Sequence, residues 1–132
     1  MRGRRSRSSG RPTDGELEIL QVLWRRGPST VREVHEELRE QTGTGYTTIL
    51  KLLQIMHVKG LVERKDDQRT HIYTAAQEES KAKSGLVQDM IDRVFDGSAS
   101  SLVMRAMDAQ KPDKAELAEI RKALEELERD MK

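Results

Sequence analysis

The chain has 132 residues, of which 35% are hydrophobic and 36% charged, and its formal net charge is +1. This length allows one ordinary domain, or a small domain with an appended dimerisation element. Because a small chain buries a smaller fraction of its surface, we expect part of its apolar surface to close against a second copy. Cysteine is absent, which excludes a disulfide framework and a thiolate metal site and agrees with a reducing compartment. No apolar run approaches the ~20 residues that span a bilayer, so we expect a cytoplasmic protein without membrane insertion.

The charge is distributed unevenly along the chain. Residues 1–12 carry five arginines and no acid, a net charge of +5, whereas residues 13–75 carry −1 and residues 76–132 carry −3. A basic N-terminal part indicates a polyanionic partner. Arginine, serine and glycine cannot offset the entropy lost on ordering, so residues 1–12 are predicted to be a disordered basic arm. A tail that is merely solvated is the alternative interpretation of this segment.

Three helices are predicted in the first half of the chain. Thr13 and Thr30 each precede a glutamate by three positions, which is the spacing of a capping box at a helix N-terminus. Apolar residues at helical spacing follow both boxes and give each helix a buried face. A third helix is predicted from Tyr46 to Lys59, because Gly60 is a natural C-terminal stop.

A β-hairpin is predicted directly after these helices. Residues 61–65 and 70–75 alternate between apolar and polar types in the manner of strands, and residues 66–69 form a polar loop between them. The order of helix, helix, helix and hairpin is that of a winged helix-turn-helix. The predicted fold class is therefore mainly α with a small β-hairpin, and residues 13–76 form the winged-helix DNA-binding domain.

Residues 77–132 are predicted to form a helical dimerisation domain. An amphipathic helix is expected around residues 86–95 and a short one around residues 102–107, and Asp113 opens a last helix with a third capping box. Apolar residues recur in this last helix at steps of three and four, which is a heptad seam. The residues predicted to form the dimer interface are Met90, Val94, Leu117, Ile120, Leu124 and Leu127.

The sequence offers no catalytic or metal-binding constellation. His35, His57 and His71 share no metal-ligand spacing, and the chain has no cysteine to complete such a site. A glycine-rich phosphate loop and a grouping of serine, histidine and aspartate are both missing from the sequence. We therefore predict no metal, no cofactor and no enzymatic activity.

The third helix carries the main functional signal. Residues 43–62 contain no acidic residue, although acids are about one residue in six of the whole chain. A helix that approaches phosphates needs an outer face without carboxylates, short polar side chains that reach base edges, and a cation behind them. The residues that fit these roles are Tyr46, Thr47, Thr48, Lys51 and Gln54. An exposed helix face that merely lacks acids is the alternative.

The hairpin gives a weaker electrostatic signal. It carries three basic residues, but three neighbouring acids offset their charge. We expect one or two of the basic residues to contact phosphate, with Arg64 and Arg69 as the candidates.

Five ordered blocks resemble the BlaI/MecI/CopY family of bacterial repressors. They are LEILQVLW at 17–24, TVREVH at 30–35, YTTILKLLQ at 46–54, KGLV at 59–62 and RTHIY at 69–73. The resemblance extends over about residues 13–131 and implies a homodimer that binds double-stranded DNA at an inverted-repeat operator and blocks transcription. The base-contacting positions of the family match Thr47, Thr48, Leu50 and Lys51, with backbone contacts near Tyr46 and the hairpin. Leu50 stands where relatives have a basic residue, and Ile55 replaces a frequent arginine, so the operator sequence is not carried over.

The resemblance also bears on how such a repressor is released. The copper-responsive branch has a C-terminal cysteine cluster, which this chain lacks. The beta-lactam-responsive branch is cleaved in the dimerisation region through a membrane sensor-protease pathway. The bond that matches its cleavage position is Arg105–Ala106, although these residues differ from the asparagine and phenylalanine of the staphylococcal relatives.

Two other interpretations remain open from the sequence. A MarR-like regulator would share the architecture but would bind a small ligand in an apolar pocket between domains. A helical adaptor protein would use the heptad seam to bind another protein, and its winged helix would no longer bind DNA.

Overall fold

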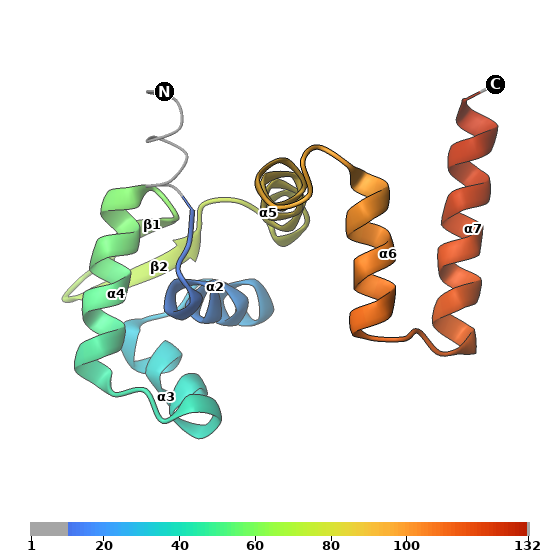
Figure 1. Cartoon of the computed structure of the whole chain (residues 1–132). Coiled ribbons are helices and arrows are strands. Elements are labelled where there is room, and N and C mark those ends of the chain that lie inside the picture. Colours follow the sequence, from blue (N-terminus) through green and yellow to red (C-terminus); the bar gives the residue numbers. More distant parts are fainter. Residues whose placement is uncertain (1–10, 132) are drawn as a thin grey trace. The chain divides into compact units, whose positions relative to one another are not determined.

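The computed structural model describes residues 11–131, and the contacts within the chain divide it into two compact units. One unit extends to Leu86 and the other begins at Val87. Each unit is described by itself, with its elements labelled in Figure 1. The basic arm predicted for residues 1–12 falls almost entirely outside the described residues. The predicted domain boundary after residue 76 stays a prediction, since the division between the compact units falls within a helix.

The helices of the first unit begin and end where the sequence predicts. They are α2 (Asp14–Arg26), α3 (Val31–Thr42) and α4 (Tyr46–Lys59). The hydroxyl group of Thr13 accepts a hydrogen bond from the Glu16 backbone, and the Glu16 carboxylate accepts one from the Thr13 backbone, so the first capping box is confirmed. Thr30 and Glu33 form the second box in the same way. Gly60 ends α4 in the left-handed conformation, with a φ angle of 85° that glycine adopts without strain.

The hairpin consists of β1 (Val62–Asp67) and β2 (Thr70–Ala75), which pair in antiparallel register. The predicted loop over residues 66–69 was wrong, because β1 continues through Asp66 and Asp67. Asp66 lies opposite His71, and the carboxylate and ring nitrogen approach to 2.6 Å. This cross-strand contact extends the ladder and leaves only two residues in the turn, of which Gln68 has a positive φ angle of 59°.

The core of the first unit lies between its three helices and the hairpin. Its buried apolar residues are Ile19, Leu20, Val22, Leu23, Val31, Val34, Leu38, Ile49, Leu53, Met56, Val62 and Tyr73. Tyr73 is buried in β2, and its backbone exchanges two hydrogen bonds with Ser29 in the loop between α2 and α3. The hairpin is therefore attached to the helices by a single antiparallel bridge. The Tyr73 hydroxyl group is buried and has no hydrogen-bond partner among the described residues.

A buried ion pair joins the beginning of α2 to the end of α4. Glu16 is only 2% exposed, and the Lys59 ammonium group lies 2.7 Å from its carboxylate. The same ammonium group donates a hydrogen bond to the backbone carbonyl of Arg11 at 3.3 Å. Because a buried carboxylate is stable only when it is paired and hydrogen-bonded, Lys59 fixes the C-terminal end of α4 against α2.

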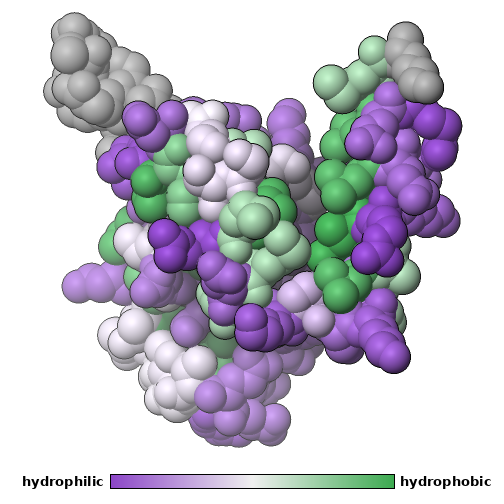
Figure 2. Space-filling view, turned by 45° about the vertical axis from the view of Figure 1, so that its right-hand side comes forward, coloured by the Kyte–Doolittle hydropathy of each residue, from purple (hydrophilic) through white to green (hydrophobic). Residues whose placement is uncertain are grey.

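The remaining helices are α5 (Glu79–Arg93), α6 (Ala99–Ala109) and α7 (Lys114–Asp130). The third capping box is confirmed, since Asp113 and Glu116 exchange both hydrogen bonds. The helix expected around residues 86–95 begins earlier, at Glu79. None of the residues of α5, α6 and α7 is buried, although these helices are amphipathic. Figure 2 shows apolar side chains gathered in a stripe along α7.

None of the helices in residues 11–131 is long and apolar enough to cross a membrane. This finding concerns the described helices alone.

The Glu16–Lys59 pair generates the first prediction. Lys59→Met should lower the free energy of unfolding by roughly 3 kcal/mol, because it leaves a buried carboxylate without its counter-charge. Adding Glu16→Gln should recover part of this loss, since glutamine is neutral and still serves the capping box. Urea denaturation of the parent and both variants at one protein concentration measures the difference. If Lys59→Met alone is as stable as the parent, the ion pair contributes nothing to the free energy of unfolding.

Candidate nucleic-acid interface

The two sides of α4 have opposite character. Ile49, Leu53 and Met56 are fully buried in the core, and Thr47, Lys51 and Gln54 follow one another on the exposed side. Tyr46 and Thr48 are also exposed, at the N-terminal end of the same helix. Lys51 forms no ion pair with any described residue, so its ammonium group is available to a ligand. The structure therefore brings five of the predicted contact residues to the exposed surface of one helix.

Leu50 differs from the other predicted contact residues. It is half-buried and packs against the core, so it offers less surface than its neighbours. Two apolar residues that were not among the predicted contacts lie on the exposed side instead, Ile55 and the 87% exposed Val58. Their helical spacing from Thr47 and Lys51 was the signal that could have identified them. Such side chains can contact the methyl group of thymine in a major groove.

The N-terminus of α4 is built differently from those of α2, α3 and α7. Those three helices have capping boxes with an acidic side chain in the first turn, whereas α4 has Gly45 as its N-cap residue, without a side-chain cap and without an acid in the first turn. Its first backbone N–H groups therefore keep hydrogen-bonding capacity for an anion, which the helix dipole also favours. The rings of His35 and Tyr46 pack edge to face with their centroids 5.7 Å apart, so His35 supports Tyr46 at this end of the helix.

The hairpin presents its basic residues unequally. Arg69 lies in the exposed turn and forms no ion pair with a described residue. Arg64 lies 3.7 Å from Asp66, whose carboxylate also contacts His71. The charge of Arg64 is therefore partly offset, and Arg69 at the tip of the hairpin is the stronger candidate for a phosphate contact.

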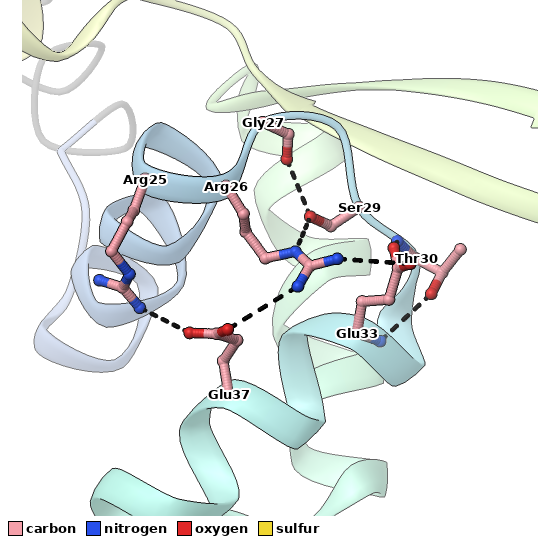
Figure 3. A network of polar contacts seen from close by, with 7 residues as sticks. All are labelled: Arg25, Arg26, Gly27, Ser29, Thr30, Glu33 and Glu37. Atoms are coloured by element: carbon pink, nitrogen blue, oxygen red, sulfur yellow. Dashed lines mark hydrogen bonds and ion pairs between the residues drawn. The ribbon is translucent and has the colours of Figure 1, made fainter.

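A polar network between α2 and α3 holds these two helices together (Figure 3). Arg25 lies 2.9 Å from Glu37, and Arg26 contacts both Glu33 and Glu37 while its Nε atom donates to the hydroxyl group of Ser29. The hydrogen bond from Arg25, together with the charges of Arg25 and Arg26, lowers the pKa of the Glu37 carboxyl group below its usual value. These two arginines are thus engaged within the protein, in contrast to Lys51.

The structure also locates the residues predicted for dimerisation and cleavage. Met90, Val94, Leu117, Leu124 and Leu127 are exposed and Ile120 is half-exposed. Arg105 and Ala106 lie within α6, and Arg105 lines an open groove of about 710 Å³ in the second unit. The other residues that line this groove are Val94, Phe95, Asp96, Ser100, Ser101, Met104 and Asp108.

Residues 11–131 contain no group of three or more histidine and acidic side chains that could hold a metal ion.

Comparison with known proteins assigns the family. The model of a family described as penicillinase repressor matches residues 12–126, which is most of the chain. The chain belongs to the penicillinase repressor family. The resemblance seen in the sequence is thus confirmed, and so is the expectation of a regulator rather than an enzyme.

Individual relatives carry names of the same kind. The chain is 34% identical over 118 residues to the transcriptional regulator BlaI of Mycobacterium tuberculosis, with 86% of this chain and 84% of that protein covered. It is 26% identical over 112 residues to the methicillin resistance regulatory protein MecI of Staphylococcus aureus, with 85% and 91% covered. It also has 28% identity and a TM-score of 0.49 to a solution structure of the DNA-binding domain of the repressor BlaI, over 54% of this chain and 87% of that one.

The exposed side of α4 generates the second prediction. Thr47→Ala should reduce the preference for the best duplex selected from random DNA by ~1–3 kcal/mol, because the shortened side chain no longer reaches a base edge. Lys51→Ala should instead weaken binding to all duplexes and reduce the dependence of affinity on salt. Fluorescence anisotropy titrations at several salt concentrations separate the two effects.

The matched control is Lys122→Ala, which removes the same charge from α7. It should leave both affinity and salt dependence unchanged. If both α4 variants bind like the parent, α4 does not read the DNA.

Proposed function

We propose that this protein is a cytoplasmic transcriptional repressor that binds, as a homodimer, an inverted-repeat operator in double-stranded DNA. The observation that carries the proposal is the exposed side of α4, which combines hydroxyl and amide groups with the free cation Lys51 and has no acid. This set of groups suits a helix that lies in a major groove, where sequence is read by contacts to base edges. The names of the relatives as regulators and repressors agree with it.

Each contact residue has a role in this proposal. Thr47, Thr48 and Gln54 contact base edges, and Lys51 neutralises a phosphate group beside them. Tyr46 and the uncapped N-terminus of α4 hold the DNA backbone. Leu50, at the border of the core, makes a van der Waals contact to a base. Arg64 and Arg69 place the hairpin on a neighbouring phosphate, with Arg69 as the principal contact.

The exposed apolar side chains of α5, α6 and α7 support the proposal of a homodimer. Leu124 is 55% exposed and Met131 83% exposed, and no residue of α5, α6 or α7 is buried. Helices with an apolar side and no core are stable only when that side packs against something. A second copy of the same chain offers a matching stripe, and a two-fold dimer fits paired half-sites in one operator. We therefore assign Met90, Val94, Leu117, Ile120, Leu124 and Leu127 to the dimer interface.

Release by proteolysis concerns a peptide bond inside α6. Arg105 and Ala106 lie in the middle of α6, where the backbone is helical and hydrogen-bonded. A protease can cleave this bond only when α6 opens locally, which is easiest in a helix without buried side chains. We propose that a membrane sensor-protease pathway acts on this bond and separates the dimer.

Selection from random-sequence duplexes tests the function itself. We expect the enriched sequences to form an inverted repeat whose half-sites are separated by about one helical turn of 10 base pairs. Binding to the selected duplex should weaken steeply as the salt concentration rises. Selection that enriches no common sequence would contradict a sequence-specific repressor and favour the helical adaptor.

The seam of α7 generates a prediction about the dimer. Leu124→Asp should abolish dimerisation and operator binding at concentrations where the parent is bound, because it buries a charge without a partner at a cost of several kcal/mol. Analytical ultracentrifugation at micromolar protein measures the mass, and anisotropy measures DNA binding.

Ala118→Asp is the matched control, since it adds the same charge on the opposite side of α7. It should remain a dimer and bind DNA like the parent. A Leu124→Asp variant that is still a dimer would place the interface on α5 and α6 instead.

A further inference from the structure

A hydrogen bond from Trp24 attaches the connection between the hairpin and α5 to α2. Trp24 lies in the last turn of α2, and its indole Nε1 atom donates to the backbone carbonyl group of Gln77 at 3.0 Å, 53 positions away in the sequence. The ring of Trp24 is half-buried and packs against the core, which keeps the donor in place. A tryptophan with this degree of burial usually finds a partner for its N–H group. Here the partner is the backbone of the segment that leads out of the hairpin.

The same segment is also bound to the residue before the hairpin. It consists of residues 76–78, between β2, which ends at Ala75, and α5, which begins at Glu79. The backbone N–H group of Ala76 donates to the carbonyl oxygen of Leu61 at 2.9 Å. Two consecutive residues of a surface connection, a kind of segment that is usually mobile, are therefore bound to two different elements. The chain that continues into α5 starts from a fixed point.

This fixed point matters for a protein that binds two half-sites. One turn of DNA is about 35 Å long and contains about 10 base pairs, so each added base pair moves a half-site by about 3.5 Å and turns it by about 35°. Three extended residues span about 10 Å at most. A free connection of three residues could follow a half-site that is shifted by one or two base pairs. A connection that is bound at two consecutive residues could not.

We propose that Trp24 is a positioning residue that sets the spacing between the two half-sites that this protein accepts. It acts through the carbonyl group of Gln77, which it keeps on the winged helix, and not through a contact to DNA. When one α4 helix is bound, the second one is then aligned with a half-site at one spacing only. This inference rests on the proposed function, because it requires a homodimer on an inverted repeat.

Three variants of the full chain test this role. Trp24→Phe keeps an aromatic ring against the core but removes the donor. Gln77→Ala is the matched control, because the acceptor is a backbone carbonyl group and the Gln77 side chain is exposed. In the third variant two glycines are inserted between Glu78 and Glu79, which lengthens the connection and leaves the core unchanged. Thermal unfolding without DNA checks that each variant is folded.

The probes differ only in the arrangement of their half-sites. They are the inverted repeat selected above, the same repeat with one, two or five base pairs inserted between its half-sites, and a duplex in which one half-site is scrambled. Anisotropy titrations give the affinity for each duplex. The spacing penalty is the ratio of the affinity for the selected repeat to that for a widened repeat.

The parent should bind the selected repeat more tightly than every widened one. For Trp24→Phe the penalty for one or two inserted base pairs should fall by about two- to tenfold, which is the contribution of one hydrogen bond to an equilibrium. The glycine insertion should lower the same penalty at least as far, and Gln77→Ala should match the parent. All variants should bind the single half-site like the parent, since α4 is unchanged. Five inserted base pairs turn the second half-site to the opposite side of the DNA, so every chain should bind that repeat like the single half-site.

Other results overturn the proposal. Trp24 has no positioning role if Trp24→Phe keeps the parent's spacing penalty, if Gln77→Ala loses it, or if the parent binds every widened repeat as tightly as the selected one. A glycine insertion without effect would mean that the connection does not set the spacing. If Trp24→Phe weakens binding to the single half-site and to all repeats by one factor, Trp24 serves the fold of the winged helix alone. A failure of the proposed function would appear differently, as a parent that binds the inverted repeat no better than a single half-site or unrelated DNA.

Discussion

The first unit depends on the pairing of Glu16 with Lys59. A carboxylate as deeply buried as that of Glu16 is unfavourable unless a cation approaches it, and Lys59, the last residue of α4, supplies one. The pair therefore fixes the position of α4 against α2, although its two residues are 43 positions apart in the sequence. The same glutamate completes the capping box of α2, and the same lysine holds the carbonyl group of Arg11. One contact thus positions the beginning of α2, the end of α4 and the backbone at Arg11.

Charge is separated between the helices in a way that serves this arrangement. Arg25 and Arg26 of α2 form ion pairs with glutamates of α3, so the opposite charges of these side chains largely cancel. On α4 the exposed cation has no such partner among the described residues, and the first turn has neither an acid nor a side-chain cap. The protein therefore presents hydrogen-bonding groups and positive charge to a ligand on α4, while the acids of the ion-pair network lie on α3.

Much of this fold could be predicted because its signals are local. Capping boxes and glycine stops depend on residues only a few positions apart, so the beginnings of α2 and α3 and the end of α4 at Gly60 could be predicted. The predicted loop over residues 66–69 was wrong because Asp66 and His71 contact each other across the two strands. Local sequence preferences do not indicate such a contact. The Glu16–Lys59 pair and the burial of Leu50 likewise depend on which distant surfaces meet. The exposed position of Thr47 and Lys51, in contrast, follows from helical spacing alone.

The exposed apolar sides of α5, α6 and α7 have a consequence for how the protein is made. During synthesis the residues up to Leu86 can fold as soon as they leave the ribosome, since their core is complete within one chain. Helices α5, α6 and α7 have no buried residue. Their apolar sides stay exposed and prone to association until another surface covers them. Among the described residues most of the exposed apolar side chains lie in the C-terminal half, which is therefore the main target for chaperones and quality-control proteases in a newly made chain. Under the proposed dimerisation, the abundance of the protein in the cell would depend on how quickly new chains pair as well as on how fast they are translated.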